Sequence, residues 1–332
     1  GLGDVYKRQI KDRPHIATSI VPKGELELAL TGSEKAEVVE EAIVQGAEAG
    51  GEASQQAADY ERTPSSFDRT VEPPFGKPYT LPTPDVWRDT LDNGTGVYGI
   101  TSSETPLVYF SLVFDAGRDR GDVNKPAIAS LTADLLNKGT ATKTTAELED
   151  AIKSLGSKIS ISAGANSTYV SGSTLSRNFA QTMALAEEML LEPRWDAEEF
   201  ELLKRKQLNK IDQDAGNPNA IASREAAKLQ YAADHIFSYQ PYGTREKLET
   251  VTLDDLKAFY QANYSPVRSQ FNIAGDVDAG VVKAALAGLS QRWNSPGTEP
   301  VSLPQANEVE QSAVYFYDIP GAKQSVLRIL RP

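Results

Sequence analysis

Histidine and cysteine, which supply most metal ligands and reactive nucleophiles, are scarce in this sequence. The 332 residues include two histidines, His15 and His235, and no cysteine. Disulfides and thiolate zinc sites are therefore excluded. His235 follows an amphipathic helical pattern, where a lone histidine more often interacts with the helix C-terminus than takes part in catalysis. Ser173 and Ser176 have no histidine near them in the sequence, so a serine nucleophile is unsupported.

Acidic clusters could supply general acid–base pairs, but their spacing favours solvated helix faces. Such clusters occur at 147–150, 187–188 and 198–201. The cations at 204–206 stand where they could form i,i+4 pairs with the last of these clusters. The run Gly275-Asp276-Val277-Asp278 follows a predicted strand but lacks the glycine spacing of a phosphate-binding loop. None of these groups predicts a catalytic site.

Composition limits the classes of partner. The sequence carries 34 Lys and Arg against 46 Asp and Glu, for a net charge of -12 and a pI near 4.8. An acidic surface argues against a nucleic-acid partner, which requires cations to meet phosphate. Hydrophobic residues make up 40% and charged residues 24%, as in soluble globular proteins. No apolar run reaches the roughly 18 residues of a membrane helix, and no signal peptide is recognisable.

The first quarter of the sequence predicts the end of one folded unit and a linker. Residues 22–49 form an amphipathic pattern, strand-like at first and helical after Thr31-Gly32-Ser33. Residues 50–84 are rich in Gly, Ala and Pro, which is typical of an extended linker. Residues 1–9 resemble translated adapter sequence. Because the sequence begins without Met and stops after a strand-like run at 325–330, we expect a fragment of a longer chain.

Residues 85–300 alternate between strand and helix patterns, which predicts an α+β domain with a mostly antiparallel sheet against a cluster of helices. A pair of strands is expected at 97–101 and 108–114, joined by a turn at 103–105, with further strands at 158–162, 168–173 and 271–274. Helices are expected at 127–136, 144–155, 177–191, 197–214, 219–235, 252–262 and 281–289. Two of them open with capping boxes, at Thr144 with Glu147 and at Thr252 with Asp255.

Several short motifs stand in a fixed order along this domain. They are Asp115-Ala116-Gly117-Arg118, the predicted helix 127–136, Asn137-Lys138-Gly139-Thr140, Gln240-Pro241-Tyr242-Gly243-Thr244 and Ala274-Gly275-Asp276-Val277. Together, over about residues 91–292, their order and spacing resemble the pitrilysin/insulinase zinc peptidases, the M16 family. The run 322–326 resembles the start of a further domain. The resemblance implies the LuxS/MPP-like α+β fold, with residues from about 243 onward similar to the C-terminal-type region.

Members of that family carry an inverted zinc motif, H-x-x-E-H, on the helix before the Gly-Thr pair. Two histidines one helical turn apart bind the metal, and the glutamate takes a proton from the metal-bound water. Counting back from Gly139-Thr140 places the histidine positions at Ser130 and Asp134, and the glutamate position at Ala133. A third ligand, usually Glu about 76 residues later, falls at Lys210.

These four residues do not suit zinc. One carboxylate and one hydroxyl are too few donors, and the charge of Lys210 opposes a divalent cation. Shifting the register does not help, because no histidine lies between His15 and His235. We therefore expect no catalytic residue and no metal ligand in this segment. A hydrolase that uses Asp134 with another metal has little support.

The resemblance implies a role without catalysis. M16 enzymes close two homologous halves around a chamber: one half holds zinc, and the other supplies shape, charge and substrate contacts. We expect residues 1–49 to end a preceding M16-like domain, 50–84 to form the linker, 85–300 to form the first domain of a non-catalytic half, and 301–332 to begin the next. Its partners would be a zinc-bearing half, fused or separate, and peptide substrates. The Arg and Tyr that often stabilise the oxyanion would lie beyond residue 332.

One competing function keeps the fold but removes peptidase activity altogether. The chain could be a structural subunit, like the core subunits that this family contributes to respiratory complexes. An H-x-x-E-H motif upstream of residue 1 would favour the peptidase, and its absence the scaffold. Because fused bacterial members are often exported, we expect a periplasmic location, with the cytoplasm as the alternative.

Overall fold

The computed structural model describes residues 26–29, 31–32, 68, 70–72, 75–76, 83–299, 301–302, 305–308, 313–321 and 325–330. The chain divides into two compact units, Gly1–Tyr79 and Thr80–Pro332. In the first, Leu26–Leu28 form a 3-10 helix, η1, where the sequence predicts a strand. Residues 1–9, the helix predicted up to residue 49 and most of the predicted linker lie outside the described residues.

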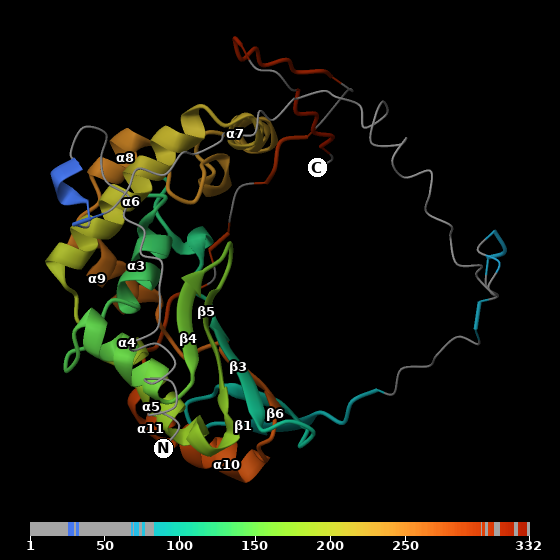
Figure 1. Ribbon diagram of the computed structural model, residues 1–332, viewed down its shortest axis with the longest axis vertical. Coiled ribbons are helices and arrows are strands. Elements are labelled where there is room, and N and C mark those ends of the chain that lie inside the picture. The colour runs from blue at the N-terminus through green and yellow to red at the C-terminus, as the bar shows by residue number, and fades with distance from the viewer. Residues whose placement is uncertain are drawn as a thin grey trace. The chain divides into compact units, whose positions relative to one another are not determined.

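The centre of the second unit is a mixed β-sheet (Figure 1). Within the described residues, its strands are β1 (Trp87–Thr90), β2 (Gly96–Thr101), β3 (Leu107–Phe114), β4 (Lys158–Ala163), β5 (Thr168–Leu175) and β6 (Gln270–Gly275). They lie in the order β1-β2-β6-β3-β5-β4. Only the β2–β6 pair is parallel among these neighbours. The predicted α+β class, with a mostly antiparallel sheet, is confirmed.

One predicted pairing is wrong. The strands expected at 97–101 and 108–114 exist, but β6 lies between them, with Phe271 opposite Val97 on one side and Leu112 on the other. Neighbouring strands are about 4.8 Å apart, so the loop 102–106 easily spans one intervening strand. Phe271 is fully buried, and an apolar strand gains most from a central place in the sheet.

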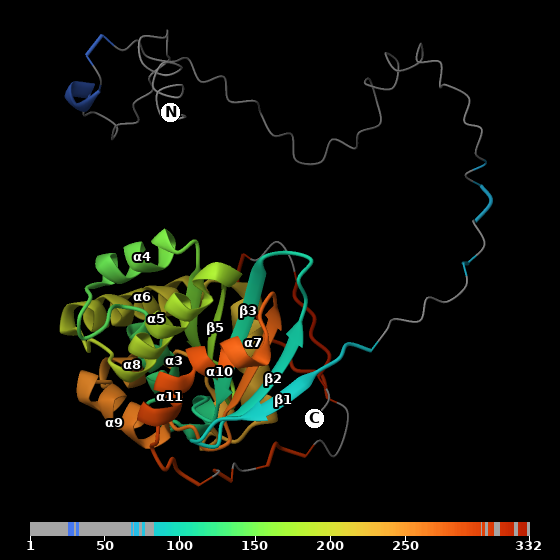
Figure 2. The same cartoon turned by 90° about the horizontal axis from the view of Figure 1, so that it is seen from below.

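Helices cover one face of the sheet, as Figures 1 and 2 show. The described helices are η3 (Arg118–Arg120), α3 (Ile128–Leu136), α4 (Thr145–Ser154), η4 (Ser176–Asn178), α5 (Phe179–Leu191), α6 (Ala197–Ala215), α7 (Pro218–Gln230), η5 (Ile236–Ser238), α8 (Arg245–Glu249), α9 (Leu253–Asn263), α10 (Ala279–Ala285) and α11 (Ala287–Arg292). Both predicted capping boxes are present, at the starts of α4 and α9. The sequence did not predict the short elements β1 and α8. In the described segment 325–330, the predicted strand is absent.

The core fills the space between this helical layer and the sheet. Along β3, Val108, Phe110, Leu112 and Phe114 are buried, whereas Tyr109 points to the other face and is exposed. The Phe114 ring lies edge-on to Tyr264 and Trp293, at centroid distances of 5.0 and 5.3 Å. Burial of one such side chain contributes roughly 1.5–3 kcal/mol.

His235 does not interact with a helix C-terminus, so that prediction is wrong. Helix α7 ends at Gln230 because Tyr231 turns to extended backbone. His235 instead precedes η5, and its Nδ1 accepts a hydrogen bond of 3.0 Å from the Phe237 amide. The imidazole is 2% exposed and stacks on Tyr231. Its surroundings are those of a structural residue in the core.

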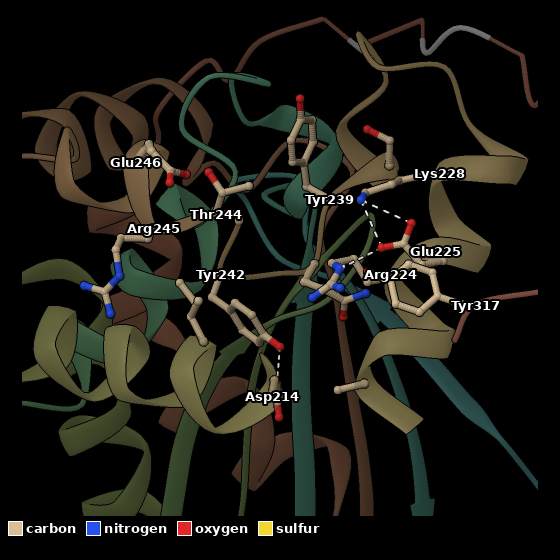
Figure 3. A pocket seen from close by; sticks show the side chains of 15 residues that line it. Asp214, Arg224, Glu225, Lys228, Tyr239, Tyr242, Thr244, Arg245, Glu246 and Tyr317 are labelled. Atoms are coloured by element: carbon tan, nitrogen blue, oxygen red, sulfur yellow. Dashed lines mark hydrogen bonds and ion pairs between the residues drawn. The ribbon is translucent and has the colours of Figure 1, made fainter. Parts of the chain in front are cut away.

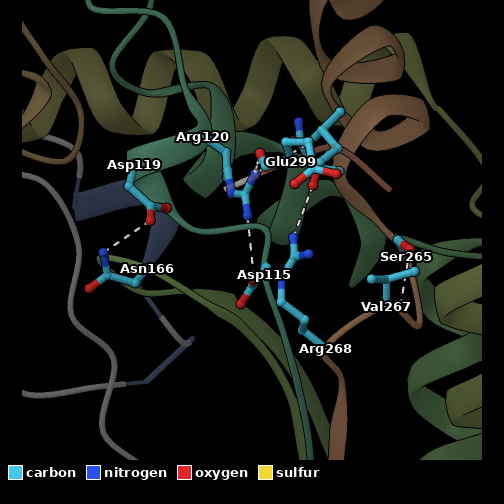
Figure 4. A network of polar contacts seen from close by, with 10 residues as sticks. Asp115, Asp119, Arg120, Asn166, Ser265, Val267, Arg268 and Glu299 are labelled. Carbon is cyan, nitrogen blue, oxygen red and sulfur yellow. Dashed lines mark hydrogen bonds and ion pairs between the residues drawn. The ribbon is translucent and has the colours of Figure 1, made fainter. Parts of the chain in front are cut away.

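Two arginines hold the segment that follows α11 (Figure 4). Arg120 and Arg268 both bind the Asp115 carboxylate, at 3.3 and 2.6 Å. Arg268 also donates to the Thr298 carbonyl at 2.9 Å, and Arg120 donates to the Glu299 carbonyl. The direction in which the chain leaves the domain is therefore fixed by charge-assisted hydrogen bonds.

Candidate functional site

Helix α3 carries three of the four positions that the resemblance singles out. Its apolar side, including Leu131 and the fully buried Ala133, packs into the core. Ser130 and Asp134, one turn apart, are only partly buried. After the helix, Gly139 has a φ of +112°, a conformation that side chains other than glycine rarely adopt. This glycine lets the chain turn away from α3 immediately after its last turn.

Helix α6 brings the fourth position to the same place. Asp134 and Lys210 line one depression on the surface of the domain, although they lie far apart in the sequence. The Ser130 hydroxyl donates to the Ala127 carbonyl at 3.0 Å and to the Pro241 carbonyl at 3.4 Å. The structure therefore brings Asp134 and Lys210 to one depression, whereas Ser130 contacts the Pro241 carbonyl and Ala133 lies in the core.

The ammonium group of Lys210 belongs to a network that the sequence did not predict. Lys210 Nζ lies 2.7 Å from the Asp214 carboxylate, which also accepts a hydrogen bond from the Tyr242 hydroxyl (Figure 3). Asp214 is buried, with 8% of its surface exposed. The i,i+4 spacing of Lys210 and Asp214 was the available signal. Sequence alone could not show that Tyr242, from a distant loop, completes the network.

Hydrogen bonds and burial shift the pKa values in this network in opposite directions. The bond from Lys210, followed by that from Tyr242, lowers the pKa of Asp214 below its ordinary value. Burial raises the pKa of Tyr242 to about 12, and its hydrogen bond to the Asp214 carboxylate adds to this effect. At neutral pH Asp214 is therefore a carboxylate and Tyr242 a neutral phenol.

Asp134 stands in a different environment. Burial raises the pKa of its carboxyl group, while the charges of Lys206 and Lys138 and a hydrogen bond from Gln207 oppose the rise. Desolvation is the largest of these effects. A carboxyl group of this kind is a weak ligand for a divalent cation unless other donors share the ion.

The residues at the family's zinc positions do not fit the metal. Ser130 uses its hydroxyl on main-chain carbonyls, Ala133 offers no donor, and the Lys210 ammonium is bound to Asp214. Across the described residues, no three or more His, Cys, Asp or Glu side chains lie where they could share an ion. Tetrahedral zinc needs three or four nitrogen, sulfur or carboxylate donors.

A second cavity lies beside the network, between α6, α7 and the loop that leads to α8 (Figure 3). Its volume is about 440 Å³. Arg224 and Lys228 both pair with Glu225 on its wall, at 2.9 and 3.0 Å. Its charged groups thus largely satisfy one another, and Tyr239 and Tyr242 provide its aromatic surface.

Several of the other acidic candidates have structural partners. Glu147 closes the capping box of α4, and Glu149 pairs with Lys153. Glu188 accepts hydrogen bonds from Thr140, Thr142 and Lys143. These contacts hold the ends of helices and loops.

Comparison with known proteins shows which family the domain resembles. Residues 250–332 match the family model described as the peptidase M16 inactive domain. Over these residues the chain is similar to the inactive class of M16 domains. The expected resemblance to the M16 family is confirmed.

Solved structures show the same fold. The M16 inactive domain from Pseudomonas fluorescens superposes with a TM-score of 0.62 at 24% identity, covering 67% of this chain and 54% of that one. A protease from Helicobacter pylori gives 0.58 at 19% identity, covering 68% and 54%. The periplasmic protease PqqL from Escherichia coli gives 0.59 at 21% identity, covering 68% and 26%. The chain thus spans about half the length of the first two of these structures.

No curated protein matches the sequence. Among the described residues, no helix combines the length and the apolar character needed to cross a bilayer.

Proposed function

We propose that the M16 domain is part of the non-catalytic half of a zinc metallopeptidase and itself lacks catalytic residues. In this proposal it helps to enclose a chamber in which peptides are hydrolysed by a zinc-bearing half, fused or separate. Residues 1–49 would end a preceding M16-like domain, 50–84 would link it to the domain at 85–300, and 301–332 would begin the next. Zinc would be held by the other half.

The observation that carries this proposal is the replacement of the metal's donors by a closed polar network. Lys210 lines the same depression as Asp134, at positions where two ligands would be required, and it is bound to Asp214. A cation in this position repels Zn²⁺, while Tyr242 and Asp214 hold α6 against the loop before α8. The fold is kept without the chemistry, as expected for a domain that contributes surface.

The test is a complementation assay with the zinc-bearing M16 half encoded in the same genome. A quenched fluorogenic peptide is hydrolysed by that half alone, by this chain alone and by the two together. We expect no chelator-sensitive cleavage by this chain alone. The mixture should show kcat/KM raised about tenfold or more, since a completed chamber positions the substrate. A stable complex with no stimulation would overturn the proposal and favour the structural subunit.

The comparison with solved structures also bears on the cellular location of this protein. The similar protease PqqL is described as periplasmic, and we propose export to the periplasm, with the cytoplasm as the alternative. Cell fractionation of the full-length protein tests this directly, because a periplasmic protein is released by osmotic shock together with known periplasmic markers.

A further inference from the structure

The depression over Asp134 carries more cationic than acidic side chains. Arg205, Lys206 and Lys210 of α6 line it, against the single carboxyl group of Asp134. Its volume is about 630 Å³, within the roughly 300–1,000 Å³ of ligand-binding pockets. Since the whole chain has a net charge of -12, this positive excess is a local property of the surface.

Of the three cations that line the depression, Arg205 and Lys206 are available to a ligand, because Lys210 pairs with Asp214. The sequence predicts that Lys204, Arg205 and Lys206 pair with glutamates one turn earlier on the helix. Lys204 instead donates to the carbonyls of Glu249 and Val251, at 2.7 and 2.9 Å. Arg205 and Lys206 are exposed, and neither forms an ion pair with any carboxylate in the described part of the chain.

The chemistry of the lining points to a carboxylate. Arginine binds carboxylates through two parallel N–H donors, and lysine adds a compact positive charge. Gln207, Asn209 and Gln213 also line the depression and offer neutral amide donors. Apart from Asp134, all of its lining residues belong to α6, so the depression lies along that helix. This shape suits a side chain carried on a longer chain.

We propose that this depression binds acidic side chains of peptides, with Arg205 and Lys206 as the principal contacts. The inference rests on the proposed function, because it names the class of peptide that the non-catalytic half would favour. A carboxylate in the depression would lie between the two free cations, with Lys210 adding positive charge from the next turn of α6. Asp134 would oppose it, so removal of that carboxyl group should strengthen binding.

The test is fluorescence anisotropy on the whole chain with two short labelled peptides. One carries several glutamates, and the other has glutamine at each of those positions. We expect the acidic peptide to bind about tenfold more tightly at low salt, with the difference shrinking as salt screens the charges. The double variant Arg205→Gln/Lys206→Gln should lose most of this preference. Asp134→Asn should increase it.

Lys257→Gln is the matched control, since it removes one cation on α9, outside the depression, that pairs with Asp254. It should leave both affinities unchanged, and thermal melting confirms that each variant is folded. Equal binding of the two peptides would overturn the inference, as would an equal loss in Lys257→Gln. Charge-selective binding without stimulation of the zinc-bearing half contradicts only the proposed function. Stimulation without charge selectivity contradicts only this inference.

Discussion

At the scale of residues, the site consists of side chains that bind one another and do not suit a metal ion. The Lys210 ammonium group, at the expected third ligand position, pairs with the buried Asp214 carboxylate, which also accepts a hydrogen bond from the Tyr242 hydroxyl. Motif spacing in the sequence singled out Ser130, Asp134 and Lys210, which lie on the two helices α3 and α6. The i,i+4 spacing pointed to Asp214 as the partner of Lys210. The bond from Tyr242 to Asp214 could not be predicted, because contact between segments distant in the sequence leaves no local pattern.

Removal of the Tyr242 hydroxyl should weaken the network. Tyr242→Phe deprives the buried Asp214 carboxylate of one hydrogen-bond donor, so we expect the free energy of unfolding to fall by about 1–2 kcal/mol. Urea denaturation followed by circular dichroism measures it. Tyr239→Phe is the matched control, because its exposed hydroxyl makes only a 3.3 Å bond to the Ala233 carbonyl. A loss in the control as large as that in Tyr242→Phe would show that the network contributes nothing specific.

Asp134→Asn should stabilise the protein near neutral pH. The pKa of Asp134 is raised above 3.8 in the folded state, so the unfolded chain ionises first as pH rises. Stability therefore falls through the window between 3.8 and the folded pKa, and the cost persists at pH 7. The variant lacks this cost. Its advantage in Tm should be present at pH 7 and vanish near pH 3, where both states are protonated.

Asp85→Asn, at an exposed position, controls for the general effect of removing one negative charge from an acidic protein. It should change the free energy of unfolding by less than about 0.5 kcal/mol. If Asp134→Asn shows no more stabilisation than this control at pH 7, the carboxyl group carries no desolvation cost.

At the scale of elements, local signals predicted structure well where they were complete. The capping boxes at Thr144 and Thr252 placed the starts of α4 and α9, since both partners lie within one turn. The pairing of β2 with β6 could not be predicted, because it joins strands separated by most of the domain. The short strand β1 was missed for lack of a long alternating pattern. Helix α7 ends early because the next residues pack around His235.

Asn137 should protect the outer edge of the sheet. Its side chain accepts from the Ile161 amide and donates to the Ile161 carbonyl, at 2.9 and 2.8 Å, and so satisfies the edge of β4. Asn137→Leu leaves both backbone groups without these partners. We expect a loss of about 1–3 kcal/mol and faster amide exchange at Ile161 by hydrogen–deuterium exchange. Asn124→Ala, in an exposed turn, should change neither; unchanged exchange in Asn137→Leu would contradict this role.

At the scale of the whole molecule, the domain has the M16-type fold, but its described residues include no group of side chains suited to bind zinc. The sheet and its helices share the fold of the M16 inactive domain from Pseudomonas fluorescens, while α6 carries an ion pair between Lys210 and Asp214 near its contact with α3. The fold class could be predicted from the sequence because the motifs are spread along the whole domain.

The most direct test of this account is the zinc content of the purified chain, measured by elemental analysis after dialysis against a slight excess of zinc and then against metal-free buffer. We expect far less than one bound zinc per chain, and we expect this chain alone to show no chelator-sensitive peptide cleavage. One tightly held zinc per chain, with chelator-sensitive cleavage by this chain alone, would contradict it.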